Sequence, residues 1–329
     1  MTTSKIRLWL VIQTLACYAA VAHAQSSDYP QRPIRLVVPF AAGGGIDVST
    51  RAIIPAWGNR IKGTFIVDNK PGAGGTIAAA DVARSPGDGY TVMMTLSDPV
   101  VNAVALFKSL PYDPARDFKY ITKSYETGTM IVIGASAKIS NLRDMLAEAK
   151  KESGRITYGS FGPGSNPQLV FEALAKEAGV KFTEVAYKGL PPGLQDALSG
   201  RIHMVSSSAG VFAALAAAGK VVPLALTGDK RSALLPNVPT FKEAGFNGFL
   251  LGNTTWVGLI GPVSISNALA ERLADSLRAA MQEPELQKML SDRDLNLVAS
   301  TPAEFDKAFR AEYAVIPRMM RDDLKIVPQ

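Results

Sequence analysis

The sequence predicts an α/β protein built as two lobes with mostly parallel sheets. Short apolar runs alternate with segments of helical spacing, and turns marked by glycine or proline separate them. The chain has 329 residues, which is more than one hydrophobic core usually serves. The strand–helix alternation also starts afresh after residue 130, so we expect a second lobe there.

The N-terminus has the pattern of a secretory signal. Lys5 and Arg7 form a basic start, residues 8–21 form an apolar core, and Ala22-His23-Ala24 matches a small-x-small cleavage site. The apolar core is shorter than the roughly 20 residues of a membrane-spanning helix. We therefore expect residues 1–24 to be removed and the mature chain to be soluble and periplasmic. An uncleaved anchor, or a lipoprotein through Cys17, is the alternative.

The first segment of the first lobe is expected to contain three strands, and the turns after the first two suit a binding site. The first two strands run into glycine-rich turns, and the third runs into Leu96-Ser97-Asp98. A helix extending through Trp57 follows the first turn. The expected strands are 34–40, 65–68 and 90–95, and the glycine-rich turns are 41–45 and 71–75.

The second lobe is expected to contain a further strand–turn–helix unit. A strand at 156–159 leads through the turn 160–165 to a helix that starts at Asn166-Pro167 and stops at Gly179. Apolar residues at helical spacing in that helix predict a core face. Its other expected elements are a strand at 130–134 and a helix at 141–151.

The remaining elements predict how the lobes are connected. After a strand at 256–260 the chain reads as helical to its end, and Thr301 with Glu304 matches a capping box at the last helix. We expect crossings near 126–130 and 251–257, with the C-terminal helices returning to the first lobe. The expected division is lobe 1 in 25–128 and 254–329, and lobe 2 in 129–253. The helical segments are 267–281, 283–290 and 302 onward.

The composition excludes most catalytic chemistry in the mature chain. It retains one histidine, His203, and no cysteine, so a zinc site or a Ser-His-Asp hydrolase lacks residues. His203 lies in an apolar run, which indicates a partly buried strand residue. No Gly-x-Gly-x-x-Gly or phosphate-loop motif is present, and Lys and Arg are scattered. We therefore expect a protein that is not an enzyme, uses no cofactor or metal and binds no nucleic acid.

Strand–turn–helix units nevertheless favour an anionic ligand. Glycine lets the backbone approach a ligand, and free N–H groups at a helix start attract an anion. If the turns at 41–45 and 160–165 face each other across a cleft, they can hold a carboxylate. Ordinary tight turns are the alternative that spacing alone leaves open.

The same turns carry a resemblance to a known family. The sequence resembles the Bug family, the periplasmic receptors of tripartite tricarboxylate transporters, in the same order over nearly the whole mature chain. The matching stretches are residues 29–34 and 37–40, Gly43-Gly44 with Asp47 and Arg51, 69–75, 88–91, 110–113, 158–160, Gly162 with Gly164-Ser165, 187–189, Arg231 with 235–240, and 243–245.

This resemblance implies a fold, a ligand and a site. It implies a type II periplasmic-binding-protein fold that closes like a Venus flytrap on a small carboxylate, which backbone groups, hydroxyls and water hold. The partners implied are membrane subunits of the transporter, and we expect a monomer. The site residues implied are Phe40, Ala41, Ala42, Gly43, Gly44 and Asp47 in the first lobe, and Ser160, Gly162, Gly164 and Ser165 in the second.

The distal end of the ligand site departs from the family pattern. Gln168-Leu169 replaces the usual His-Leu, and Ala186 replaces the proline before Tyr187-Lys188-Gly189. The sequence leaves open a tricarboxylate, an aliphatic dicarboxylate, an aromatic acid, an amino acid or nicotinate. It also leaves open a sensor for a membrane kinase, or an enzyme using Asp47 or a serine. The outer-site candidates are Ser97, Gln168, Tyr187, Ser206, Ser207 and Asn253.

Overall fold

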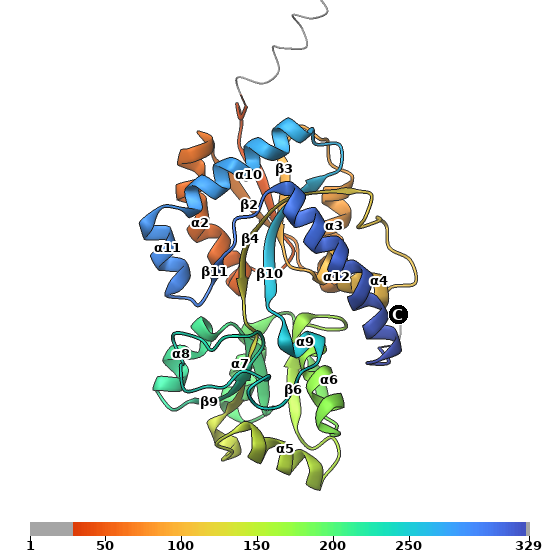
Figure 1. Ribbon diagram of the computed structural model, residues 1–329, viewed down its shortest axis with the longest axis vertical. Coiled ribbons are helices and arrows are strands. Elements are labelled where there is room, and N and C mark those ends of the chain that lie inside the picture. The colour runs from red at the N-terminus through yellow and green to blue at the C-terminus, as the bar shows by residue number, and fades with distance from the viewer. Residues whose placement is uncertain (1–28, 327–329) are drawn as a thin grey trace, which may run out of the picture.

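The computed structural model describes residues 29–326, so the expected signal peptide lies outside the described residues. Two lobes lie one above the other, each around its own sheet (Figure 1). The upper lobe holds a six-stranded sheet of order β11-β4-β10-β3-β1-β2, and the lower lobe holds a five-stranded sheet of order β7-β6-β8-β5-β9. The expected two-lobed α/β architecture is confirmed.

The first lobe is built from both ends of the chain. Its strands are β1 (Ile34–Val38), β2 (Phe65–Asn69), β3 (Thr91–Thr95), β4 (Phe118–Thr127), β10 (Thr255–Pro262) and β11 (Asn296–Leu297). Its helices are α2 (Gly45–Ile61), α3 (Thr76–Ala83), α4 (Ala103–Leu106), α10 (Asn267–Met281), α11 (Pro284–Ser291) and α12 (Pro302–Asp322), with the short η1 (Ala73–Gly75) and η2 (Asp98–Asn102).

The second lobe is one continuous stretch. Its strands are β5 (Met130–Gly134), β6 (Thr157–Ser160), β7 (Thr183–Ala186), β8 (Met204–Ser207) and β9 (Val221–Leu226). Its helices are α5 (Leu142–Lys151), α6 (Asn166–Ala178), α7 (Leu190–Ser199), α8 (Ala209–Ala217) and α9 (Phe249–Gly252), with the short η3 (Ala135–Ala137).

Both sheets are mixed, because the chain crosses between the lobes twice. β1 pairs parallel with β2 and β3, and β6 pairs parallel with β7 and β8. The strands next to the crossings run the other way: β10 is antiparallel to β3 and β4, and β5 is antiparallel to β8 and β9. β4 leads directly into β5, and α9 leads into β10.

Each sheet is covered by side chains on both faces. Along β1, Leu36 and Val38 pack under α2 and α10, whereas Val37 points to the opposite face, toward α3 and α12. β5 alternates in the same way, with Ile131 on one face and Val132 on the other. Burial on both faces explains why these strands appear in the sequence as nearly continuous apolar runs.

Two local details differ from the sequence prediction, and one agrees. Helix α2 continues past Trp57 and an exposed Pro55 to Ile61. The N-cap of α6 is Ser165, so Asn166 is the first helical residue and its side chain is free for other contacts. The capping box at Thr301 is present, since Thr301 Oγ1 accepts from Glu304 N at 3.3 Å and Glu304 Oε2 accepts from Thr301 N at 2.8 Å.

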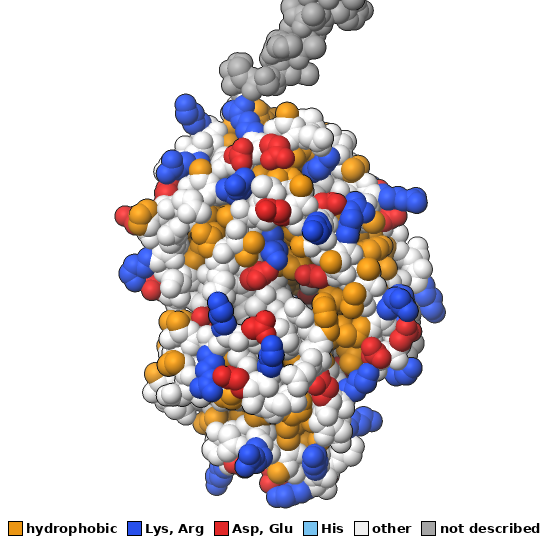
Figure 2. Space-filling view, viewed as in Figure 1, with side chains coloured by type: hydrophobic (Ala, Val, Ile, Leu, Met, Phe, Trp, Pro, Cys, Tyr) orange, Lys and Arg blue, Asp and Glu red, His pale blue; other side chains and the backbone are white. Residues whose placement is uncertain are grey.

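Neither the described helices nor the distribution of surface charge indicates a membrane-spanning segment or a basic stripe on the face shown in Figure 2. Within residues 29–326, no helix is long and apolar enough to cross a bilayer. On the face shown in Figure 2, basic and acidic side chains are interspersed over both lobes. Many belong to short ion pairs such as Arg310–Asp306 at 2.7 Å and Lys288–Asp292 at 2.8 Å.

Candidate functional site

A cavity of about 450 Å³ lies between the two sheets and is lined from both lobes. The first lobe contributes the turn after β1 and residues after β3, and the second lobe contributes residues after β6 and β8 and the start of α7. Because ligands of open α/β sheets bind beyond the carboxyl ends of parallel strands, this is the expected place for a binding site. The structure thus brings the turn at 41–45 and part of the turn at 160–165 to one hollow.

The turn after β1 is held rigid by a buried carboxylate. Asp47 is 3% exposed and accepts from Gly43 N at 2.8 Å, from Arg51 Nε at 2.9 Å and from Asn69 Nδ2 at 3.0 Å. Burial alone would raise the pKa of Asp47, but these hydrogen bonds hold its pKa below the ordinary value. Asp47 is therefore an ionised anchor of the turn, with its charge balanced by Arg51.

This anchor leaves the start of α2 open to the cavity. Gly43 has φ of +79°, a conformation that suits glycine, and Gly44, Gly45 and Ile46 line the cavity. Among the described residues, no acceptor is bonded to the backbone N–H groups of Gly45 and Ile46, as expected for the first turn of a helix. These donors and the positive end of the helix dipole favour an anion at this point.

The second-lobe turn is arranged differently from the expectation of free main-chain donors. Phe161 N donates to Ser165 Oγ at 3.2 Å, Gly162 N donates to Ser160 Oγ at 3.0 Å, and Gly164 N donates to Gln168 Oε1 at 2.6 Å. Ser160 and Ser165 of the turn, together with Gln168 of α6, thus satisfy these N–H groups. From this turn Phe161 lines the large cavity, and from the start of α6 Asn166 and Pro167 line it.

The same turn docks against the first lobe. Gly164 has φ of +70°, and a Cβ there would lie 1.7 Å from Leu106 Cδ1, so no side chain fits. Asn102 Nδ2 donates to the Gly164 carbonyl at 3.0 Å. The glycine is therefore required by the close approach of the two lobes as well as by the bend.

Asp98 is a second buried carboxyl group, and it joins the lobes. It is 3% exposed, lines the cavity and accepts from Asn102 Nδ2 at 3.1 Å and from Asn166 N, in the other lobe, at 3.3 Å. Burial raises the pKa of Asp98 to about 7, which the hydrogen bond from Asn166 only partly offsets. Near neutral pH this carboxyl group exchanges readily between its neutral and charged forms.

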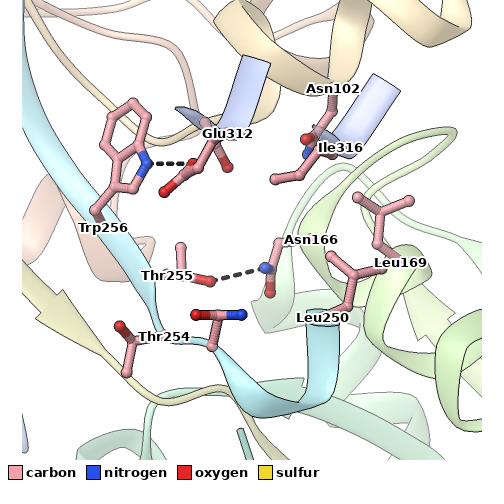
Figure 3. A pocket seen from close by; sticks show the side chains of 11 residues that line it. Asn102, Asn166, Leu169, Leu250, Thr254, Thr255, Trp256, Glu312 and Ile316 are labelled. Carbon is pink, nitrogen blue, oxygen red and sulfur yellow. Dashed lines mark hydrogen bonds between the residues drawn. The ribbon is translucent and has the colours of Figure 1, made fainter. Parts of the chain in front are cut away.

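The crossing strands meet the second-lobe turn at the side chain of Asn166 (Figure 3). Asn166 Nδ2 donates to Thr255 Oγ1 at 2.7 Å, and Asn166 Oδ1 accepts from Thr129 Oγ1 at 2.9 Å. Nearby, Trp256 Nε1 donates to Glu312 Oε2 at 2.7 Å, and burial raises the pKa of Glu312. Asn166, Thr255, Trp256 and Glu312 border a small cavity of about 40 Å³, which has room only for water-sized molecules.

Three helices of the second lobe also begin at the large cavity. Their first residues include Asn166 in α6, Leu190 in α7, and Gly210 just after the start of α8. Helix α7 begins Leu-Pro-Pro, so it offers few free N–H groups. Ser206, at the end of β8, is 1% exposed, and its hydroxyl has no hydrogen-bond partner within residues 29–326. The Ser206 hydroxyl is thus a polar group of the cavity wall with no hydrogen bond to the described residues.

The predicted site residues fall into groups. Seven line the large cavity: Phe40, Ala41, Ala42, Gly43, Gly44, Ser206 and Ser207. Asp47, Ser160, Gly162, Gly164, Ser165 and Gln168 lie behind it, bonded within their turns. Ser97 and Asn253 line the small cavity. Tyr187 donates to Asp196 Oδ2 at 2.9 Å and lines neither cavity.

Sequence reasoning missed most of the apolar lining. Tyr125, Leu190, Leu194, Val211 and Leu295 line the large cavity, and nothing in their spacing distinguishes them from core residues. His203 was expected to be a partly buried strand residue; its Nδ1 lies 2.9 Å from Thr157 Oγ1, away from the cavity, and burial lowers its pKa. Within residues 29–326 no cluster of three or more His, Cys, Asp or Glu could hold a metal ion.

The chain matches one family of receptors and is similar to several known proteins. Residues 51–319 match the family model described as tripartite tricarboxylate transporter family receptor. A Cupriavidus necator protein described as UPF0065 protein in gbd 5′ region is 33% identical over 281 residues, which cover 85% of this chain and 84% of that protein.

Two solved structures superimpose closely on the whole described fold. R. palustris Rpa4515 with adipate has a TM-score of 0.86 and 27% sequence identity, covering 92% of this chain and 100% of that one. The periplasmic binding protein BugD has a TM-score of 0.85 and 26% identity, with the same coverage of 92% and 100%. Both similarities extend across the two lobes and therefore across the cleft.

Proposed function

Because this chain belongs to the family of tripartite tricarboxylate transporter receptors, the Bug proteins, we propose that it captures a small organic carboxylate between its lobes and delivers it to a transporter of that type. The observation that carries this proposal is the start of α2: Gly45 and Ile46 line a cavity shared by both lobes, and their N–H groups have no acceptor within residues 29–326. Relatives of the same fold are binding proteins, one of them with adipate, which supports a carboxylate as the ligand.

We propose that the turn at residues 40–44 and Ser206 contact the ligand directly. The other predicted site residues act by holding the turns: Asp47 fixes the first, and Ser160, Ser165 and Gln168 fix the second. Ser97, Gly162, Gly164 and Tyr187 are proposed to shape the surroundings of the cleft. This division of roles follows from which polar atoms are already bonded within the chain and which are not.

The proposed mechanism is closure of the lobes around the ligand. The ligand stabilises the closed form only by its higher affinity for that form. Hydrogen bonds between the lobes would add to the stability of the closed form. They join Asp98 to Asn166 and Asn102 to Gly164. The crossings that flex would lie at the proposed lobe limits, 128/129 and 253/254, where β4 passes to β5 and α9 to β10.

The remaining parts of the proposal concern place and partners. We propose that residues 1–24 direct export to the periplasm and are removed, and that the monomer docks in its closed form on membrane subunits of the transporter. As a receptor rather than an enzyme, it returns its ligand chemically unchanged.

Titration calorimetry of the purified mature chain with citrate, malate, adipate, benzoate and 3-phenylpropionate tests the proposal. We expect saturable binding of at least one acid at one site per chain, and unchanged acid when the complex is denatured and its contents analysed. Absence of binding to all of them, or conversion of an acid to another compound, would contradict the proposed function.

A further inference from the structure

The wall of the large cavity is mainly apolar, and this restricts the ligand. We infer that the ligand is a monocarboxylate whose body is apolar and larger than a benzene ring, such as an arylalkanoate, an inference that rests on the proposed function. Small hydroxylated tri- and dicarboxylates should bind poorly to this site. The side chains, the charges and the size of the cavity each support this restriction.

Apolar side chains from both lobes surround the space beyond the turn at residues 40–44. Most of the surface that lines the cavity is apolar. From the first lobe these side chains are Phe40, Ile46, Leu96, Tyr125, Val257 and Leu295; from the second they are Phe161, Pro167, Leu190, Leu194 and Val211. A ligand hydroxyl placed against such a wall loses its water without gaining a partner, whereas an aromatic or aliphatic body gains from burial.

The charges of the lining match a single carboxylate. Among the described residues that line the cavity, Arg293 is the only base and Asp98 the only acid. The guanidinium of Arg293 donates to the Met289 carbonyl at 3.2 Å. Arg293 is thus the one basic side chain of the described lining that can balance the charge of the carboxylate at the start of α2. A second or third carboxylate in this space would be buried without a cation of its own, which is strongly unfavourable, and Asp98 in its charged form would repel it.

The volume of the cavity favours a ligand whose apolar part is larger than a benzene ring. Its volume of about 450 Å³ is roughly three times the ~150 Å³ of an apolar cavity that binds benzene. At one edge of the cavity the backbones of the two lobes are in contact. A Cβ on Gly210 of α8 would lie 2.5 Å from the Arg293 carbonyl oxygen. A cleft of this volume with a mainly apolar lining is filled best by a ring with an aliphatic extension.

One group of acids and a pair of matched variants test this inference. Thermal shift and calorimetry are run with 3-phenylpropionate, octanoate, adipate, malate and citrate. We expect 3-phenylpropionate and octanoate to raise the melting temperature, and to bind at least about 30-fold more tightly than malate and citrate. Tighter binding of citrate, malate or adipate would overturn the inference and leave the proposed function intact. No binding of any of these acids would overturn both.

Variants on one helix locate the apolar body. Leu194 lines the cavity, and Leu198, one turn later on α7, is 36% exposed and lines neither cavity. We expect Leu194→Asn to weaken 3-phenylpropionate binding by about 10-fold, and Leu198→Asn to leave it unchanged. Val211→Thr, with exposed Val263→Thr as its control, serves the same purpose if Leu194→Asn does not fold. Equal affinities for the lining and control variants would contradict the inference.

Discussion

The carboxyl group of Asp98 in the first lobe accepts a hydrogen bond from the backbone N–H of Asn166 in the second lobe at 3.3 Å. Asn166 is the first residue of α6, and its side chain also contacts both crossing strands through Thr129 and Thr255. One residue therefore links the first lobe, the crossings and the cavity wall. This link places a buried acid at the contact between the lobes.

The stability of the protein should depend on the protonation of Asp98. Its pKa of about 7 in the folded chain lies above its ordinary value of 3.8, so the folded state binds more protons between these pH values. Stability from this group is therefore full below pH 4, falls as the pH rises toward 7 and stays low above it. The total effect is on the order of 4 kcal/mol.

The measurement is the melting temperature from pH 5 to pH 9 for the wild type and Asp98→Asn. We expect the wild type to lose stability relative to the variant as the pH rises, because the variant has no charge to bury. Asp292→Asn, at an exposed position just after α11, serves as the control. Parallel curves for the wild type and Asp98→Asn would show that Asp98 does not titrate in this range.

Ligand affinity should depend on pH through the same group. Asp98 lines the cavity that we propose for a carboxylate, and its charged form repels a second negative charge. We expect calorimetry to show weaker binding at pH 8 than at pH 6, and proton uptake on binding at pH 8. In Asp98→Asn the pH dependence should disappear; a dependence that persists there would assign it to another group.

Asp47 should stabilise the first-lobe turn without contacting the ligand. Asp47→Ala removes the acceptor for Gly43 N, Asn69 Nδ2 and Arg51 Nε. We expect a loss of about 1–3 kcal/mol in the free energy of unfolding, measured by urea denaturation, together with weaker binding. Asp306→Ala, which removes an exposed ion pair with Arg310 on α12, should cost less than about 1 kcal/mol. Equal losses in both variants would refute the anchoring role.

Gly210 should control closure rather than folding. An alanine Cβ there would lie 2.5 Å from the Arg293 carbonyl oxygen, although alanine itself favours the helix α8. We expect Gly210→Ala to melt no earlier than the wild type but to bind its ligand about 10-fold more weakly, because the closed form is disfavoured. Small-angle scattering with ligand should show a larger radius of gyration. Val263→Ala, at an exposed position just after β10 that lines neither cavity, is the control; unchanged affinity in Gly210→Ala would contradict the role in closure.

The sequence was sufficient for the fold because burial leaves a clear pattern. Strands such as β5, covered on both faces, appear as continuous apolar runs, and turns are marked by glycines such as Gly43 that need a positive φ. The residue limits of the two lobes stay a prediction, since the crossings are continuous with the strands on either side. The residue type of Asn166 predicts a helix cap, but Ser165 is the N-cap, and contacts to Thr129 and Thr255 use the Asn166 side chain instead.

The binding site was only partly visible in the sequence. The turn at residues 40–44 could be placed because glycine spacing marks it, whereas Leu194 and Val211 look like any other helical core residue. Sequence spacing predicts free N–H groups in the second-lobe turn, yet Ser165 of the turn and Gln168 of α6 satisfy two of them. Sequence spacing shows which residues are near a turn, but not which hydrogen-bond donors are already used.

The central claim is that the start of α2 binds the ligand carboxylate, and substitutions at Gly45 test it most directly. Gly45 is the first residue of α2 and follows an extended Gly44, and a Cβ at Gly45 would meet no atom within 4 Å, so both alanine and proline fit there. Gly45→Ala keeps the backbone N–H, and Gly45→Pro removes it. Calorimetry with the acid that stabilises the wild type most should show about 10-fold or weaker binding for Gly45→Pro than for Gly45→Ala. Equal affinities for the two variants would contradict the claim.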